Sequence, residues 1–384
     1  MKWCFIAPGY KTVDILHDNS NEFGGGESQV AYLATGLAKL GHQVDLIYGD
    51  DRANVAPRVI AGIRCLHAFP SWKRPESLPA FWAALNESAA DLIYARVPNV
   101  FLWLTGIFSK SHPSSTLVFA PGGDRNCNPW QAFTPRNKWL HTPLYALGLQ
   151  LVDIIAAQHD AQADLIRPYV RGKLIVVPNL MPTITWKARK FEETDIDAIW
   201  IAGIRPVKQL PVFLDVAEKL PDLQFAVVGG FAASVDQESR RDLENRMARM
   251  SNLRFLGPQP REKVFQLLIR SKILVNTSVW EGFPNTMLEA WSVNVPVVSL
   301  KIDPGGVIQQ ETIGLVSGTI PQLIHDVEQL VQTRQLNCEM GKKGREYVDK
   351  THNWEAVRRA LEQVMPGVQP QDDRLAAEES HAVT

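Results

Sequence analysis

Features that mark several large classes of protein are missing from this sequence of 384 residues. Its four cysteines, Cys4, Cys65, Cys127 and Cys338, are scattered and lack the spacing of a metal site or a disulfide framework. No run of 18 apolar residues occurs, which argues against a membrane-spanning helix. The apolar run at residues 3–7 is too short for a signal peptide. We therefore expect a cytoplasmic protein with reduced thiols.

The composition is ordinary for a globular protein, with 45% hydrophobic and 21% charged residues. At this length we expect two domains, each with its own core. The net charge of −1 conceals an asymmetry: residues 1–190 carry 19 basic and 14 acidic side chains, and residues 191–384 carry 21 and 27. A basic first half favours an anionic acceptor or a membrane surface, and chance scatter of charge is an equal alternative.

Short apolar runs alternate with longer amphipathic runs along the chain, which favours βα units and parallel sheets. In the first half the runs that predict strands are residues 2–8, 43–48, 59–69, 92–96, 117–121, 154–158 and 174–178. In the second half they are residues 198–203, 224–230, 253–257, 273–278, 296–300 and 314–317. Each half therefore supports its own doubly wound α/β sheet, and the polar stretch 182–194 is the predicted linker.

The most informative segment is residues 281–289, Glu-Gly-Phe-Pro-Asn-Thr-Met-Leu-Glu. It follows a strand-like run and enters a helix-like run, which places Glu281 in a loop and Glu289 in the second turn of a helix. Pro284 suits a first turn, because its missing N–H would be unpaired there anyway. A helix N-terminus favours phosphate, and neighbouring carboxylates accept hydrogen bonds from sugar hydroxyls. A nucleotide sugar carries both groups.

Three further segments contain candidate ligand-binding residues. Arg205 and Lys208, after the first strand of the second half, are cations that suit a diphosphate leaving group. The glycine run 24–26 precedes an amphipathic helix and would let a ligand approach the backbone. Asp124 and His159 each follow a strand of the first half, where open parallel sheets bind ligands. Solvated cations, a flexible turn and loop-capping side chains are the structural alternatives.

Together these segments resemble retaining family 4 glycosyltransferases, which have the GT-B fold, of the bacterial polysaccharide and glycolipid type. Residues 177–179 and 255–258 also resemble framework positions of this family. The resemblance covers nearly the whole chain, except the segment 127–147 and the tail. It implies a metal-independent hexosyl- or glycosyltransferase with no cofactor. Its fold would be two Rossmann-like domains that face each other across a cleft.

The same resemblance implies the domain boundaries. Residues 1–182 would form the N-terminal acceptor domain, and residues 195–350 would form the domain that binds the nucleotide-sugar donor. A final helix at about 352–366 would cross back to the first domain. The acidic, glutamine-rich residues 367–384 have too few apolar side chains to order themselves and are the predicted disordered tail.

The resemblance also assigns roles to single residues. Glu281 would bind hydroxyls of the transferred sugar, and Glu289 would bind the ribose. Arg205 and Lys208 would stabilise the diphosphate without a metal, and Asp124 would face the donor sugar. The other implied donor-binding residues are Gly25, Gly26, Gly203, Pro258, Gln259, Gly282, Phe283, Pro284, Asn285 and Thr286.

The segment 127–147 suggests how an acceptor is reached. Its aromatic and basic side chains are Trp130, Phe133, Trp139, Arg136 and Lys138. Aromatic rings beside cations are typical of an element that contacts lipid, and a packed lid is the alternative. We expect a sugar or lipid-linked acceptor, peripheral contact with the inner face of the membrane, and no nucleic acid partner.

Other functions stay open as alternatives. A dehydrogenase would carry its glycine run immediately after the first strand, whereas about fifteen residues intervene here. A metal-dependent GT-A transferase needs Asp-x-Asp, and the match at residues 195–197 precedes a strand instead of following one. A sugar-nucleotide epimerase on the same GT-B fold, or a catalytically inactive nucleotide-sugar-binding subunit, would carry the same motifs.

Overall fold

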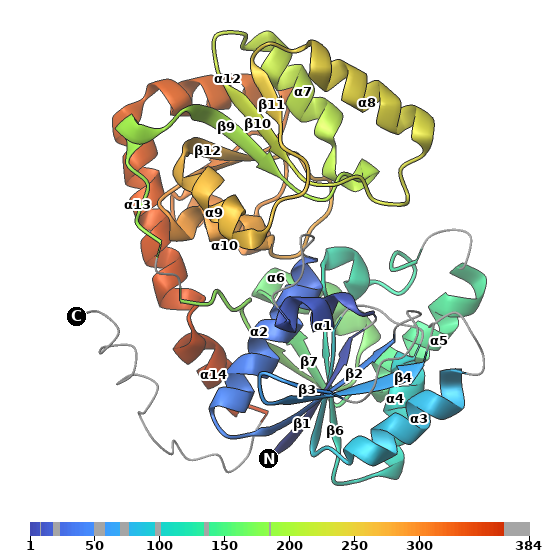
Figure 1. Cartoon of the computed structure of the whole chain (residues 1–384). Coiled ribbons are helices and arrows are strands. Elements are labelled where there is room, and N and C mark those ends of the chain that lie inside the picture. Colours follow the sequence, from blue (N-terminus) through green and yellow to red (C-terminus); the bar gives the residue numbers. More distant parts are fainter. Residues whose placement is uncertain are drawn as a thin grey trace.

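The computed structural model describes residues 1–7, 9–17, 24–49, 58–69, 77–96, 101–133, 138–183 and 186–364. The predicted tail at 367–384 and Arg136 lie outside the described residues, as does the side chain of Lys138. The described chain forms two domains, each with one sheet and helices on both of its faces (Figure 1). The predicted fold class, two doubly wound α/β domains, is confirmed.

The first sheet has the strand order β3-β4-β2-β1-β5-β6-β7-β8, and its neighbours are parallel except for β3 with β4. Its strands are β1 (Lys2–Ala7), β2 (Gln43–Gly49), β3 (Arg58–Ile60), β4 (Ile63–Phe69), β5 (Leu92–Arg96), β6 (Thr116–Ala120), β7 (Ile154–Ala157) and β8 (Lys173–Val176). Alternate residues of β1 enter different cores, Trp3 and Phe5 on one face and Cys4 and Ile6 on the other. This explains why the buried strands read as continuous apolar runs.

The single strand predicted at residues 59–69 is wrong, because this stretch folds into the antiparallel hairpin β3–β4. Ala61 and Gly62 form its turn, with φ angles of 49° and 79°. Two successive left-handed residues are what a two-residue hairpin turn requires, and glycine adopts that conformation without strain. The glycine within the run was the signal for this turn.

The second sheet has the strand order β11-β10-β9-β12-β13-β14, and all its neighbouring strands are parallel. Its strands are β9 (Ile196–Ile201), β10 (Phe225–Val228), β11 (Leu253–Phe255), β12 (Ser271–Asn276), β13 (Val297–Ser299) and β14 (Gly314–Val316). All six strands predicted from apolar runs in this half are confirmed.

The helices cover both faces of each sheet. In the first domain they are α1 (Lys11–Leu16), α2 (Gly25–Lys39), α3 (Ser77–Ser88), α4 (Leu102–Ser111), α5 (Lys138–Leu151) and α6 (Asp160–Ile166). In the second they are α7 (Leu210–Lys219), α8 (Gln237–Arg249), α9 (Arg261–Ile269), α10 (Asn285–Ser292), α11 (Val307–Gln310), α12 (Ile320–Gln332) and α13 (Arg334–Thr351). Residues of α2 share a core with one face of the first sheet, and residues of α3, α4 and α5 share a core with the other.

The last described helix, α14 (Trp354–Glu362), returns to the first domain, as predicted. Asn353 caps it by accepting the Ala356 N–H at 2.7 Å. Its buried residues Val357 and Leu361 join the core of the first domain. Figure 1 shows α13 running along the second domain and α14 lying against the first.

The linker predicted at residues 182–194 packs onto the second domain through Arg189. This side chain donates to Asn294 O, at 2.9 Å from Nη2 and 3.1 Å from Nε, and to Asn337 Oδ1 at 2.6 Å. Burial lowers the pKa of Arg189 to about 10. The polar composition of the linker therefore conceals an anchored, buried cation.

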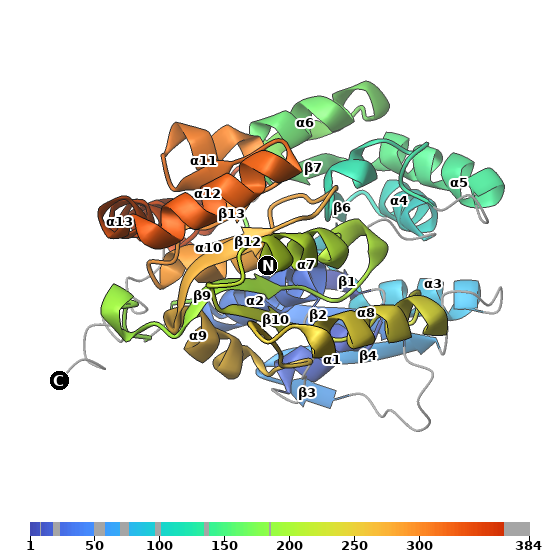
Figure 2. The ribbon, with the colours of Figure 1, turned by 90° about the horizontal axis from the view of Figure 1, so that it is seen from above.

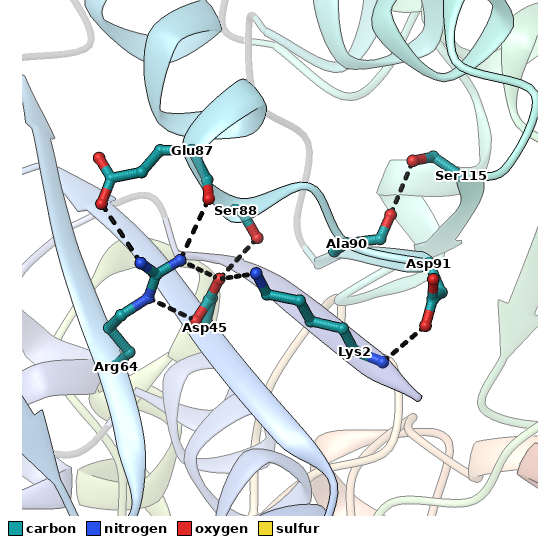
Figure 3. Close-up of polar contacts among 8 residues, drawn as sticks. All are labelled: Lys2, Asp45, Arg64, Glu87, Ser88, Ala90, Asp91 and Ser115. Atoms are coloured by element: carbon teal, nitrogen blue, oxygen red, sulfur yellow. Dashed lines mark hydrogen bonds and ion pairs between the residues drawn. The ribbon is translucent and has the colours of Figure 1, made fainter.

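A buried carboxylate near the start of β2 stabilises the first domain (Figure 3). Asp45 is 3% exposed and accepts two hydrogen bonds from Arg64, at 2.9 Å from Nε and 2.7 Å from Nη2. Ser88 Oγ donates to it at 2.8 Å, and Lys2 Nζ lies 3.7 Å away. These partners offset the cost of burying the charge.

Candidate active site

The acidic segment predicted at residues 281–289 forms the connection from β12 to α10, and the predicted order of strand, loop and helix is confirmed. Glu281 lies in the loop, and Glu289 lies in the second turn of α10. Pro284 is the residue immediately before the helix. Phe283 and Leu288 are buried in the second domain's core, so the segment is held firmly between its two carboxylates.

Lys208 and Glu281 form an ion pair within the second domain. Lys208 ends the turn Pro206–Lys208, which follows β9. The two side chains are 22% and 14% exposed, so water screens the pair only weakly. Thr277 Oγ donates to Lys208 O at 2.7 Å, which ties the loop after β12 to this turn.

Arg205 lies on the same turn but is exposed. Its guanidinium folds over Gly203, where an added Cβ would lie 3.6 Å from Nε and from Nη2. The loop after β9 therefore presents one half-buried and one exposed cation. Such a pair suits an anionic ligand with several oxygens.

Asp124 belongs to the first domain but contacts the second. It follows β6 and begins the turn Asp124–Cys127. Its N–H donates to Glu281 O at 3.1 Å, and its Oδ1 accepts from Gln162 Nε2 at 3.2 Å. Burial raises the pKa of the Asp124 carboxyl, the Gln162 hydrogen bond lowers it, and the charge of Glu281 raises it. The fold thus brings two carboxylates together from opposite domains.

A pair of glycines, Gly123 and Gly282, lets the backbones of the two domains lie close together. A Cβ on Gly282 would lie 2.2 Å from Gln158 Oε1 and 2.9 Å from Gly123 Cα. Gln158 Oε1 accepts the Phe283 N–H at 2.7 Å, and Asn179 Nδ2 donates to Phe283 O at 2.9 Å. First-domain amides therefore hold the backbone of the acidic loop, and the predicted role of Phe283 toward a donor stays a prediction.

The glycine run before α2 also meets the acidic segment. Asn285 Nδ2 donates to Gly25 O at 3.1 Å, and Gln29 Nε2 donates to Asn285 Oδ1 at 3.2 Å. Gly26 and Thr286 lie in the first turns of α2 and α10 and are partly exposed. Asn285 is therefore the side chain through which the start of α10 contacts the start of α2.

Glu289 has a cationic partner that the sequence reasoning missed. Arg261 Nε lies 3.5 Å from Glu289 Oε1, and the guanidinium lies 4.8 Å from the Tyr32 ring of α2 and 5.3 Å from the Phe265 ring. Burial raises the pKa of Glu289, whereas Arg261 lowers it. Arg261 therefore stabilises the ionised form of Glu289 and also contacts the first domain.

Comparison with known proteins identifies the family. Residues 24–180 match the profile "Glycosyl transferase 4-like domain", and residues 196–333 match "Glycosyl transferases group 1". Sucrose-phosphate synthase from Thermosynechococcus elongatus superposes with a TM-score of 0.74 at 16% identity, over 95% of this chain and 98% of that one. Anabaena HepE, solved with UDP-glucose, superposes with a TM-score of 0.70 at 16% identity, over 96% and 100%. This chain is a GT-B glycosyltransferase.

One human relative aligns with nearly the whole of this chain. One component of the human phosphatidylinositol N-acetylglucosaminyltransferase is 26% identical over 393 aligned positions, which cover 98% of this chain and 75% of the human protein. The chain spans less than half of two other curated glycosyltransferase relatives, 47% and 22% of their lengths. The predicted resemblance to GT-B glycosyltransferases is therefore confirmed.

Two residues predicted near the nucleotide base lie between β11 and α9 of this glycosyltransferase. Pro258 is exposed, and Gln259 folds back so that its Nε2 donates to Leu256 O at 2.6 Å. Both residues lie just before Arg261, which begins α9 and pairs with Glu289. Their contact with a base stays a prediction.

The Asp-x-Asp sequence weighed for a metal-dependent transferase lies at the start of β9, away from the loops that carry the site. Asp195 pairs with Arg254 at 3.0 Å and with Arg270 at 2.5 Å, and Asp197 pairs with Lys272 at 2.7 Å. The hydrogen bond from Arg270 lowers the pKa of Asp195 to about 2. These carboxylates have structural partners. Within the described ranges, no group of three His, Cys, Asp or Glu side chains could hold a metal.

Gln158 was missed, and Asn179 was noted only within the framework similarity at residues 177–179, because nothing local shows that either amide binds the other domain. Gln158 follows the end of β7 directly, and Asn179 lies shortly after β8. Both residues follow the carboxyl end of a parallel strand, where open sheets bind ligands, and this position was the signal that could have identified them. In this structure the ends of those strands bind the other domain's loop.

Proposed function

We propose that this enzyme transfers a sugar from a nucleoside diphosphate sugar to an acceptor with retention of anomeric configuration, in the synthesis of cell-surface polysaccharide or glycolipid. The observation that carries the proposal is the convergence of Asp124, Glu281 and Lys208 where the two domains meet. Carboxylates bind sugar hydroxyls, and a cation beside them suits the leaving phosphate. The UDP-glucose bound to HepE supports a nucleotide-sugar donor.

In this proposal Lys208 changes partners when the donor binds. The lysine is paired with Glu281 in the present structure. A diphosphate carries more negative charge than one carboxylate and would attract the ammonium group more strongly. The Glu281 oxygens would then be released to accept hydrogen bonds from the sugar. Asp124 would face the same sugar from the first domain.

The other predicted residues extend the donor site around this point. Glu289, beside Arg261, would accept hydrogen bonds from the ribose hydroxyls. Gly25 and Gly26 would lie against the diphosphate at the positive end of α2. The remaining predicted contacts, at Gly203, Pro258, Gln259, Gly282, Phe283, Pro284, Asn285 and Thr286, complete the donor-binding set.

Metal independence follows from the role proposed for the two cations of the β9 loop. Arg205→Ala should lower transition-state stabilisation by about 2–4 kcal/mol, as for the loss of one preorganised donor. Activity should persist in EDTA. Strict dependence on a divalent cation, together with wild-type activity of Arg205→Ala, would show that a metal and not Arg205 neutralises the diphosphate.

The test of the donor assignment starts with binding. Thermal shifts with UDP, GDP, ADP and their sugars would show which nucleotide raises Tm, because a ligand selective for the folded state stabilises it. NMR of the product's anomeric proton would then give the stereochemical outcome. An inverted product would overturn the retaining mechanism. Epimerised donor formed without an acceptor would favour the epimerase, and binding without hydrolysis or transfer would favour the inactive subunit.

We also propose an anionic, lipid-linked acceptor. Apolar side chains of α5 are exposed, namely Trp139 at 80%, Leu140 at 47% and Leu147 at 45%, and Trp130, which precedes α5 in the chain, is 62% exposed. Figures 1 and 2 both show α5 at the edge of the first domain on the side opposite α13. The human relative's name specifies a phosphatidylinositol, an anionic lipid. Among the described helices, none is long and apolar enough to cross a membrane.

Vesicle binding tests the acceptor proposal. The enzyme should bind vesicles that contain anionic lipid and should detach as salt rises, because such attraction fades within a Debye length. Trp139→Ala should weaken binding, and so should Arg136→Glu with Lys138→Glu. Ile320→Ala, which removes an exposed apolar side chain of the second domain, is the matched control. Failure to bind at low salt, with transfer to a soluble sugar, would refute the membrane contact.

A further inference from the structure

His159 occupies an unusual position beside the proposed catalytic carboxylate. It follows β7 and is the N-cap of α6, where its Nδ1 accepts the Gln162 N–H at 3.2 Å. Burial lowers the pKa of His159, so the ring is neutral near pH 7. Because Nδ1 is an acceptor, the single ring proton lies on Nε2. The helix cap thus determines the tautomer.

The Nε2–H of this ring is buried and has no hydrogen-bond partner in the described structure. It lies 3.8 Å from Asp124 Oδ1, too far for a hydrogen bond and too near for a water between them. Buried donors are nearly always paired, and catalytic hydrogen bonds are often long before substrate binds. The unpaired donor is therefore positioned to engage Asp124.

The second domain covers the same ring. Gly305, in the turn Pro304–Gly306, has a φ of 67°, and a Cβ there would lie 3.2 Å from His159 Cβ and 3.3 Å from Cγ. The backbone of this turn thus packs against the imidazole. This packing exists only while the domains are docked, so docking restrains the ring that faces Asp124.

We propose that His159 is a positioning residue whose Nε2–H donates to Asp124 Oδ1 when the donor binds, and that the turn at Gly305 holds the ring in that orientation. This rests on the proposed function, in which Asp124 faces the transferred sugar. Gln162 Nε2 already donates to the same oxygen at 3.2 Å. With Oδ1 held from two sides, Oδ2 stays available to the sugar, and both hydrogen bonds favour the ionised form of the carboxylate.

The variant His159→Asn separates this role from helix capping. Asparagine is among the best N-cap residues, so its Oδ1 replaces Nδ1 and only the Nε2 donor is lost. We expect an unchanged Tm, an unchanged KM for the donor and a kcat lower by about ten- to hundredfold, the range for one hydrogen bond to a charged group. The matched control is Asp236→Asn, which changes the N-cap of the remote helix α8.

The pH dependence gives a readout that a structural role would not change. The charged groups that face the pair are Glu281 from the second domain and Asp160 from α6. Loss of the Nε2 donor raises the pKa of Asp124, because a hydrogen bond to the ionised form lowers it. The acid limb of kcat in His159→Asn should therefore move to higher pH. In an Asp124→Asn background the same substitution should cause no further loss.

Two results would overturn the inference: His159→Asn with wild-type kcat and pH profile, or losses of His159→Asn and Asp124→Asn that multiply in the double variant. NMR titration of the imidazole provides a test that needs no turnover. Asp124→Asn should lower the pKa of His159, because the carboxylate raises it. An unchanged value would refute the coupling. By contrast, a wild-type enzyme that binds no nucleotide sugar would refute the proposed function.

Discussion

Replacing Gly282 by alanine tests whether docking of the two domains positions the acidic loop. The added Cβ would lie 2.2 Å from Gln158 Oε1 and 2.9 Å from Gly123 Cα. Gly282 does not have a positive φ, so alanine strains nothing within its own backbone. Gly282 is buried, and the atoms that an added Cβ would meet belong to Gln158 and Gly123 of the first domain. The perturbation is therefore confined to the contact between the domains.

The two clashes have different costs. The Gln158 side chain can rotate away, but the buried Phe283 N–H then loses its acceptor, which costs about 1–3 kcal/mol. Gly123 meets the new methyl with its backbone and must shift, and overpacking of this kind costs about 1–3 kcal/mol. The docked arrangement should therefore lose roughly 2–6 kcal/mol. The lower bound alone corresponds to about a thirtyfold fall in the equilibrium constant for docking.

We expect kcat/KM to fall in Gly282→Ala, by up to about thirtyfold for a cost of about 2 kcal/mol and further for a larger cost. Affinity for the free nucleoside diphosphate should fall less than kcat/KM, because the ribose partner proposed on α10 is unchanged. Small-angle scattering should show a larger radius of gyration. Gly9→Ala is the matched control, since its Cβ would meet nothing within 4 Å. Wild-type kcat/KM and wild-type scattering in Gly282→Ala would refute the reasoning.

Three further predictions concern binding, stability and pH. Glu289→Ala should weaken nucleoside diphosphate binding about tenfold by calorimetry; an unchanged Kd would exclude the ribose role. Asp45→Ala should lower the free energy of unfolding in urea by about 3–5 kcal/mol, because it leaves Arg64 and Ser88 without their buried partner; a loss below about 1 kcal/mol would contradict this. Burial lowers the pKa of His352 to about 4. The neutral ring therefore stabilises the fold above the unfolded pKa of about 6.5, and up to about 3 kcal/mol is lost as pH falls toward 4. His352→Gln should abolish that acid sensitivity, and an identical pH dependence would disprove it.

Much of the architecture was predictable because parallel strands buried on both faces appear as continuous apolar runs. The exception was the hairpin β3–β4, where the left-handed residues Ala61 and Gly62 split an apolar run that otherwise looks continuous. The acidic segment was predictable for a local reason as well. Glu281 and Glu289 are separated by a proline and a helix start, and these features depend on neighbouring residues alone.

The partners of the site residues could not be predicted in this way. Lys208 and Glu281 are 73 residues apart in sequence, and Phe283 and Gln158 are 125 apart. The sequence predicts that each residue follows a strand, but it carries no local record of which strand ends meet. That depends on the order of the strands and on how the domains dock.

The sequence by itself determined the two α/β domains, the place of the acidic segment at a helix start and the cations after β9, because these follow from apolar periodicity and turn chemistry within short windows. Only the tertiary structure decided that Asp124 meets Glu281, that Arg261 pairs with Glu289 and that His159 faces Asp124. These contacts join elements from distant parts of the chain. Their geometry depends on how closely backbones and side chains fit across the boundary between the domains, and no local pattern encodes that fit.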